Sequence, residues 1–204
     1  MHRRPAGWQA LSARPAGALR VIRSAIVALG LALADLAGAD ERLTVCHGYG
    51  CLVQEEVGYT DGQLGEIRRL MFAAGDAAGE RQRLALAVGQ LYAWAGQQSD
   101  IRHDKGGNYA DEGVSGRMDC IDHSTTTTRL LRLLEARGYL RWHRVLEPTV
   151  RAVATVLFVH RSAVIETKDD AAESFAVDSW FVDNGQPAVI LPLAEWKKGA
   201  GPDV

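Results

Sequence analysis

The chain has 204 residues, a length typical of one domain with a short extension. Hydrophobic residues make up 47% of the sequence and charged residues 24%, so we expect an ordinary packed core and exclude a disordered or fibrous chain. The formal net charge of -2 and the lack of a basic stripe argue against a nucleic-acid-binding protein.

The first 39 residues have the pattern of an export signal. Arginines but no acidic residues occur before Asp35, and an apolar run extends from Ala25 to Ala39. The run ends in Ala37-Gly38-Ala39, a small-x-small cleavage pattern, and is shorter than the roughly 20 apolar residues of a membrane span. We therefore predict a cleaved signal over residues 1–39 and an exported protein, periplasmic or secreted, with no stable membrane span in the mature chain. The alternative is an uncleaved amphipathic or disordered extension.

Residues 40–62 are rich in glycine, so we expect an irregular segment there. Cys46 and Cys51 flank the sequence HGYG, whose two glycines allow a short loop. Two thiols that can meet in an oxidising compartment usually pair, and this pairing leaves Cys120 as the odd cysteine. A metal or redox site is the alternative, but the spacing is not that of a thioredoxin-like motif and a second ligand cluster is missing from the sequence. We predict a disulfide.

Apolar residues then recur at three- and four-residue spacing, which predicts helices. The first helix begins near Gln63, the second runs from about Ala78 to Gly96, and the third runs from about Cys120 to Arg137. Residues 99–118, between the second and third helices, hold the glycines and polar groups of a loop. Gly138 is the glycine expected just past the end of a helix.

Beyond Gly138 the pattern changes to β-branched and aromatic residues, which predicts strands. Asn184-Gly185 between two apolar runs indicates a hairpin. Helices first and strands later predict an α+β domain over residues 63–204, in which the N-terminal helices pack on one side of a C-terminal antiparallel sheet.

Cys120 lies where the predicted loop becomes a helix. A helix N-terminus offers unpaired N–H groups and the positive end of the macrodipole, and both lower the pKa of a thiol. Asp119 and Asp122 are the expected helix caps, at the N-cap and the third position. Their negative charge would oppose thiolate formation if it lay close to the sulfur. We expect a reactive Cys120; the alternative is a plain buried cysteine.

His160 and Asp178 lie on successive predicted strands. Opposed side chains of neighbouring antiparallel strands are about 5 Å apart, so Asp178 can orient the imidazole. If the strand of His160 packs on the helix of Cys120, the three residues form a catalytic set in which the thiolate attacks a carbonyl, the imidazole moves the proton and the carboxylate holds the imidazole. The N–H of Cys120 would serve in the oxyanion hole. Candidates for a second oxyanion donor are Gln97, Gln98 and Asn108.

Three motifs in this order resemble the transglutaminase-like branch of the papain-like fold. They are MDCIDHSTTTTRLL around Cys120, HRSAVIE from His160, and FAVDSWFVDNG around Asp178. The chain is most similar to bacterial transglutaminase-like cysteine proteinases, which place Cys in a D-C-x-D context at a helix start and then His and Asp on successive strands. The resemblance covers about residues 85–197. It implies a papain-like core and a cysteine peptidase, amidase or acyltransferase that acts on a protein or peptide substrate and uses no cofactor.

His123, one helical turn after Cys120, departs from the apolar or aromatic residue expected there, which leaves the substrate class open. It is a candidate second base or, with Cys120, half of a metal site whose other ligands would come from His103, Asp104 or His160. The ligand spacing of a structural zinc site is missing, so we predict no metal. The alternative from another functional class is a non-catalytic periplasmic or envelope interaction module on the same fold, in which Cys120 would have ordinary thiol reactivity.

Overall fold

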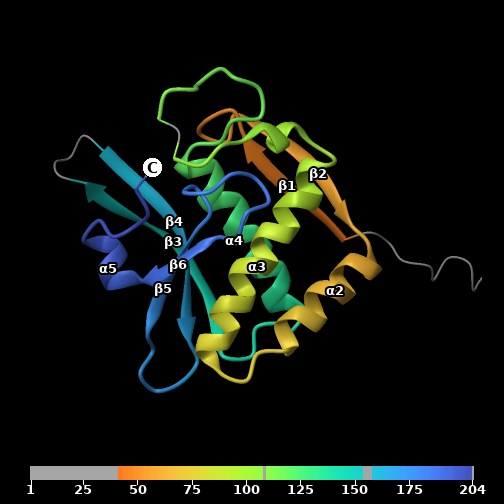
Figure 1. Cartoon of the computed structure of the whole chain (residues 1–204), viewed down its shortest axis with the longest axis vertical. Coiled ribbons are helices and arrows are strands. Elements are labelled where there is room, and N and C mark those ends of the chain that lie inside the picture. Colours follow the sequence, from red (N-terminus) through yellow and green to blue (C-terminus); the bar gives the residue numbers. More distant parts are fainter. Residues whose placement is uncertain (1–40, 108, 154–157, 204) are drawn as a thin grey trace, which may run out of the picture. The chain divides into compact units, whose positions relative to one another are not determined.

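The computed structural model describes residues 41–107, 109–153 and 158–203 (Figure 1). The chain divides after Ala39, and all described residues belong to the second part. The predicted export signal over residues 1–39 therefore lies outside the described residues. None of the described helices has the length and apolar character that a membrane crossing requires.

The first described element is a β-hairpin, which corrects the expectation of an irregular segment over residues 40–62. β1 (Glu41–His47) pairs antiparallel with β2 (Val53–Tyr59). Alternate residues are buried in each strand, such as Leu43 and Val45 in β1 and Val57 and Tyr59 in β2. The period-two pattern covers only a few residues on either side of a glycine-rich loop, and the loop dominates the composition of the segment.

Three long helices follow, as predicted, with small shifts at their ends. They are α2 (Asp61–Phe72), α3 (Ala77–Gly96) and α4 (Cys120–Ala136). Each begins after a residue whose side chain accepts a backbone N–H from the first turn, which satisfies a donor that the helix itself leaves free. These N-caps are Thr60, Asp76 and Asp119. The predicted loop 99–118 contains one short 3-10 turn, η1 (Asp100–His103).

Four strands form an antiparallel sheet in the order β3-β4-β5-β6, so the α+β class is confirmed. The strands are β3 (His143–Val153), β4 (Phe158–Thr167), β5 (Ser174–Asp178) and β6 (Val189–Pro192). The last apolar run does not continue as a strand, because the chain after β6 forms the short helix α5 (Leu193–Lys197).

The hairpin predicted from Asn184-Gly185 is present as the antiparallel pairing of β5 and β6. Gly185 has a φ of 87°, in the left-handed region that glycine tolerates. The connection is longer than a two-residue turn because Trp180 and Phe181, which follow β5, turn back to pack around His160.

Different helices cover the two faces of the sheet (Figure 1). One face carries Ala163 and Ile165 of β4, which share the main core with residues of α3 and α4. The other face meets α5, where Trp196 is fully buried. Neighbouring residues of a strand point to opposite faces, so His160 and Asp178 lie on the α5 face. The candidate site therefore joins a helix on one side of the sheet to side chains on the other.

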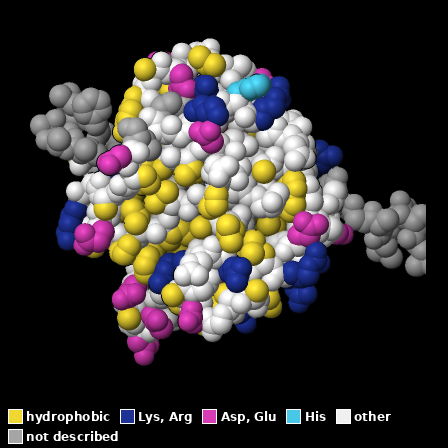
Figure 2. Space-filling model, viewed as in Figure 1, with side chains coloured by type: hydrophobic (Ala, Val, Ile, Leu, Met, Phe, Trp, Pro, Cys, Tyr) yellow, Lys and Arg dark blue, Asp and Glu magenta, His cyan; other side chains and the backbone are white. Residues whose placement is uncertain are grey.

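Hydrophobic side chains gather over α3 in the middle of the face shown in Figure 2, and charged side chains lie mostly around its edge.

Close packing holds α3 against the segment that leads to β6. A Cβ added at Gly89 would lie 2.6 Å from the carbonyl oxygen of Gln186. Glycine therefore allows backbone-to-backbone approach at this point.

Candidate active site

Cys120 is the first residue of α4. The Oδ1 atom of Asp119 accepts the N–H groups of Ile121 and Asp122, each at 2.9 Å. Asp122 reciprocates, since its Oδ2 accepts the N–H of Asp119 at 3.1 Å. The predicted caps are thus confirmed, and together they hold Cys120 at the helix start.

The sulfur of Cys120 meets β4 at the backbone on either side of His160. The thiol donates to the carbonyl oxygen of Val159, 3.8 Å from Sγ. The backbone N–H of Arg161 also faces the sulfur. The start of α4 and the strand β4 therefore meet, as the sequence predicted. In the part of the chain that is described, however, the thiol donates to this carbonyl and makes no hydrogen bond to the imidazole.

The structure brings His160 and Asp178 together. The Nε2 atom of His160 lies 2.7 Å from Oδ2 of Asp178. Trp196 donates its indole N–H to the same oxygen at 2.8 Å, and the backbone N–H of Trp180 donates to Oδ1 at 3.2 Å. Asp178 is 1% exposed, so these donors fix a buried carboxylate in one orientation. Because Nε2 is taken, Nδ1 is the ring nitrogen left for proton transfer.

Aromatic rings surround the imidazole of His160. Its centroid lies 4.8 Å from that of Trp180, 5.6 Å from that of Phe181 and 5.7 Å from that of Trp196. A buried indole N–H needs an acceptor, but only the tertiary fold shows that the acceptor for Trp196 is Asp178.

Arg151 is a buried cation beside this pair, and sequence reasoning missed it. It is the cross-strand partner of His160 on β3, and its guanidinium donates to the carbonyl oxygens of Trp196 and Ala200 at 2.7 and 2.8 Å. Burial lowers the pKa of Arg151, while the charge of Asp178 raises it. The guanidinium ties the end of the chain to the face that carries His160.

The electrostatic surroundings of Cys120 differ from the prediction. Burial raises the pKa of its thiol above the ordinary value, and the charges of Asp119 and Asp178 raise it further. The N–H groups of Arg161 and of Cys120 itself lower it, but by less. The helix-terminus effect is therefore present and outweighed. The predicted fall in the pKa is wrong.

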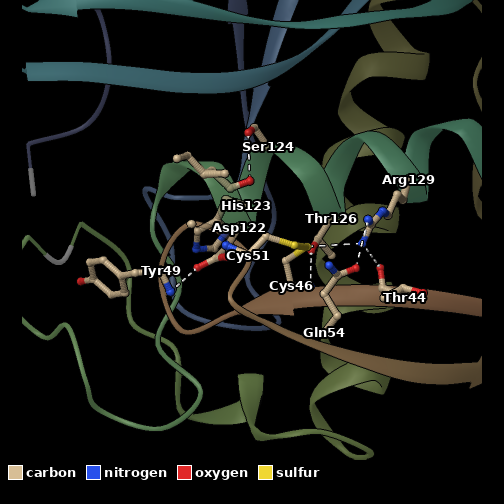
Figure 3. Close-up of a disulfide and its surroundings, with 12 residues drawn as sticks. Thr44, Cys46, Tyr49, Cys51, Gln54, Asp122, His123, Ser124, Thr126 and Arg129 are labelled. Carbon is tan, nitrogen blue, oxygen red and sulfur yellow. Dashed lines mark hydrogen bonds between the residues drawn. A yellow bond between two sulfur atoms is a disulfide. The ribbon is translucent and has the colours of Figure 1, made fainter.

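A disulfide-bonded loop lies against the start of α4 (Figure 3). Cys46 and Cys51 are joined, so the predicted disulfide is confirmed. Residues 48–51 all have positive φ, from 60° to 80°. Two of these four residues, Tyr49 and Cys51, are not glycine, and the left-handed conformation costs each roughly 1–2 kcal/mol. We call residues 48–51 the stapled loop.

The stapled loop binds the carboxylates of the helix caps. Asp122 accepts the backbone N–H groups of Tyr49 and Cys51 at 2.9 and 2.6 Å, and Asp119 accepts that of Gly50 at 3.0 Å. Three consecutive N–H groups of the loop thus face the two carboxylates. Burial nevertheless raises the pKa of Asp122 to about 6, although its backbone hydrogen bonds lower it. The loop thus gives both carboxylates backbone donors in addition to those of the helix start.

His123 turns into the core, away from the roles expected for it. Its Nε2 lies 2.9 Å from Oδ2 of Asp104, although the N–H is poorly aligned for a hydrogen bond, and its Nδ1 lies 2.9 Å from the hydroxyl of Ser179. The three residues have the side-chain types of a Ser-His-Asp triad, but each is at most 5% exposed. A substrate cannot reach them, so the arrangement is structural.

The described residues give an outcome for the expected metal ligands and for one candidate oxyanion donor, Gln98. Among the described residues, the ligand atoms found within 4.8 Å of one another are those of Cys46, Cys51 and Asp122, and the two sulfurs are already bonded to each other. Gln98 is used elsewhere, because its amide pairs with both backbone groups of Gly58 at 2.8 and 2.9 Å. Asn108 lies outside the described residues.

A pocket of ≈ 760 Å³ lies away from this site, between α3, β5 and α5. Two cations line it, and both have partners. Arg81 lies 3.2 Å from Nε2 of His143, and Lys197 donates to the hydroxyl of Thr149 at 2.7 Å. Its lining includes none of Cys120, His160 and Asp178, so it is not the cleft of the candidate site.

Comparison of the chain with protein-family models, with curated proteins and with solved structures finds no match. The resemblance to transglutaminase-like cysteine proteinases therefore rests on the motifs of the sequence.

Proposed function

We propose that the protein is an exported thiol hydrolase or acyltransferase that acts on peptide or amide bonds of a protein or peptide substrate. Cys120 is the nucleophile, His160 the general base and acid, and Asp178 the carboxylate that orients the imidazole. The observation that supports this proposal is the contact of the Cys120 sulfur with the backbone on both sides of His160. The papain-like core belongs to the same proposal and follows from the motifs. The disulfide is compatible with export.

The raised pKa of the thiol determines how the first step runs. The resting state is a neutral thiol, so the sulfur turns from the Val159 carbonyl toward His160, and Nδ1 removes the proton as the sulfur attacks the acyl carbon. The imidazolium then protonates the leaving amine, which leaves a thioester on Cys120. Water or an amine attacks the thioester, again with His160 as the base. Asp178 stabilises the imidazolium in each step.

An activated ester tests this assignment without knowledge of the natural substrate. The full chain is treated with p-nitrophenyl acetate at pH 7, and the acetyl group on Cys120 is located by mass spectrometry. His160→Ala is expected to lower the acylation rate by roughly 10²–10⁴-fold, the usual contribution of a general base. An added amine that accelerates release of the acetyl group would indicate acyl transfer. Equal acylation rates in the parent and in His160→Ala would contradict the proposal.

One observation favours a non-catalytic interaction module instead. The thiol donates to the carbonyl of Val159 and makes no hydrogen bond to the imidazole, and its pKa is raised. In such a module the reactivity of Cys120 would be independent of His160. Iodoacetamide would then label Cys120 with the same pH profile in the parent and in His160→Ala, with a midpoint above the ordinary thiol value of about 8.5.

A further inference from the structure

A buried chain of polar side chains joins α4 to the residue that follows β5. The hydroxyl of Ser179 lies 2.9 Å from Nδ1 of His123 and 2.8 Å from the hydroxyl of Thr127. Tyr92 of α3 completes the chain, with its hydroxyl 3.0 Å from that of Thr127 and 3.3 Å from the carbonyl oxygen of His123. All four side chains are buried. We call these four residues the helix–strand latch.

Two members of the latch adjoin the candidate site. His123 lies one turn of α4 after Cys120. Ser179 follows Asp178 directly in the chain, and Asp178 holds Nε2 of His160. A shift of Ser179 is therefore transmitted to Asp178 across one peptide bond. A shift of His123 is transmitted to Cys120 through one turn of a helix.

The latch differs in kind from the packing around it. Farther along α4, the helix meets the sheet through apolar side chains, with Leu130 and Leu134 in the same core as Ala163 and Ile165. Apolar burial is non-directional, so such packing tolerates small shifts of a helix along a sheet. Hydrogen bonds depend steeply on distance and angle. The position of the start of α4 along the sheet is therefore most sharply defined at the latch.

We propose that Ser179 and His123 are positioning residues, which hold Cys120 at a fixed distance from the Asp178–His160 pair. Asp104 assists because its carboxylate lies on the far side of the His123 ring and keeps that ring in place. This inference rests on the proposed function, since it assigns the latch to the same site.

The first test measures the position of Asp178 without any reaction. Hydrogen exchange of the Trp196 indole N–H is followed by NMR in the full chain, because this N–H donates to Asp178. The signal is assigned by its loss in Trp196→Phe. Ser179→Ala removes the central hydroxyl of the latch and is expected to accelerate the exchange about tenfold or more, as a weakened local structure does. An unchanged exchange rate would overturn the proposal.

Ser124→Ala is the matched control for Ser179→Ala. Ser124 is also a buried serine and is next to His123 on α4 (Figure 3). Its hydroxyl donates to the carbonyl oxygen of Ile121 at 3.2 Å, within the helix. The variant removes a hydroxyl of the same kind without cutting the link to β5, and we expect no change in indole exchange. An equal acceleration in both serine variants would show general loosening and would also overturn the proposal.

The second test measures the coupling between Cys120 and His160. The factor by which His160→Ala slows acylation by p-nitrophenyl acetate is compared in three backgrounds: parent, Ser124→Ala and Ser179→Ala. A merely structural latch changes all rates together, whereas a positioning latch changes this factor. We expect a factor of about 10² or more in the first two backgrounds and of about 10 or less with Ser179→Ala. An equal factor in all three would refute the positioning role.

The two tests separate failure of the inference from failure of the proposed function. If His160→Ala leaves acylation unchanged in the parent while Ser179→Ala accelerates indole exchange, the latch holds Asp178 in place and the catalytic assignment of His160 is wrong. If His160→Ala slows acylation but Ser179→Ala changes neither readout, the catalytic assignment stands and the positioning role is wrong.

Discussion

Two histidine–carboxylate pairs meet the chain at the end of β5, one through Asp178 and the other through Ser179, and they differ in access. The Nε2 atom of His160 lies 2.7 Å from Asp178, and that of His123 lies 2.9 Å from Asp104. The side chain of His160 is 11% exposed, and the backbone next to it contacts the free thiol of Cys120. The side chain of His123 is 4% exposed and lies among hydroxyl groups. A histidine–carboxylate pair therefore does not identify a catalytic site; access and the third group do.

A third pair supports the same conclusion. The Nδ1 atom of His143 lies 2.8 Å from Oε1 of Glu80, and both side chains are 0% exposed. Burial raises the pKa of Glu80, but hydrogen bonds from His143 and from the backbone of Arg141 and Trp142 bring it below its usual value. These contacts fasten α3 to the start of β3. The pair is structural, like that of His123.

The largest expected effect distinguishes His160 from the more deeply buried His123 by activity. His160→Ala should lower the rate of Cys120 acylation by roughly 10²–10⁴-fold. The free energy of unfolding of this variant should fall by only about 1 kcal/mol, because Asp178 keeps its other donors. Acylation rates and urea denaturation of the same preparations give both numbers. A loss of stability in proportion to the loss of activity would break the comparison.

The reverse result is expected for His123. His123→Ala removes the imidazole that faces Oδ2 of the buried Asp104 carboxylate, which keeps only the N–H of Met118 on Oδ1, so the free energy of unfolding should fall by roughly 3 kcal/mol. Urea denaturation provides the measurement. His103→Ala, at an exposed histidine of the preceding loop, is the control and should change stability by less than about 0.5 kcal/mol. A small effect of His123→Ala would mean that water or rearrangement satisfies Asp104.

A smaller effect is expected for the stapled loop. Replacement of both Cys46 and Cys51 by serine removes the disulfide and should lower the free energy of unfolding by about 2 kcal/mol, the value expected for so short a covalent loop. Denaturation of the parent with and without reductant should show the same difference. The double variant should not respond to reductant, and a response there would point to a disulfide between the Cys120 residues of two chains.

The smallest expected effect concerns pH. Asp122 titrates near pH 4 in the unfolded chain, and burial raises its pKa to about 6 in the fold. The fold then holds the proton more tightly, so this group contributes most to stability below about pH 4, and the contribution is lost as pH rises through about 6. Asp122→Asn should remove this pH dependence, on the order of 1 kcal/mol, in unfolding midpoints measured from pH 4.5 to 7.5. An unchanged slope would show that the N–H groups of the stapled loop outweigh burial.

The elements themselves could be predicted from the sequence because they depend on near neighbours. Helix α4 is defined by residues close to it in the chain: Asp119 and Asp122 cap its start, and Gly138 follows its end. The spacing of its hydrophobic residues defines its buried face. The disulfide was predictable for the same reason, since Cys46 and Cys51 are separated by only 5 positions. The order of helices and strands was enough for the α+β class.

The partners of the polar side chains could not be predicted, because they come from distant segments. His123 meets Ser179 across 56 positions, and Asp122 meets Tyr49 across 73. Periodicity shows which face of a helix is buried but not which polar group lies opposite. The alternative roles considered for His123 were therefore chemically reasonable and structurally wrong.

The sequence by itself determined that a lone thiol begins a capped helix and that a histidine and an aspartate follow on neighbouring strands. The tertiary structure alone decided the direction in which the pKa of that thiol shifts. In isolation the helix terminus lowers the pKa of Cys120, but packing against β4 removes water from the sulfur, and the fold adds the charge of Asp178 to that of the neighbouring Asp119, so the pKa rises. The difference arises because a helix terminus is a local property, whereas desolvation depends on every segment that packs around the sulfur.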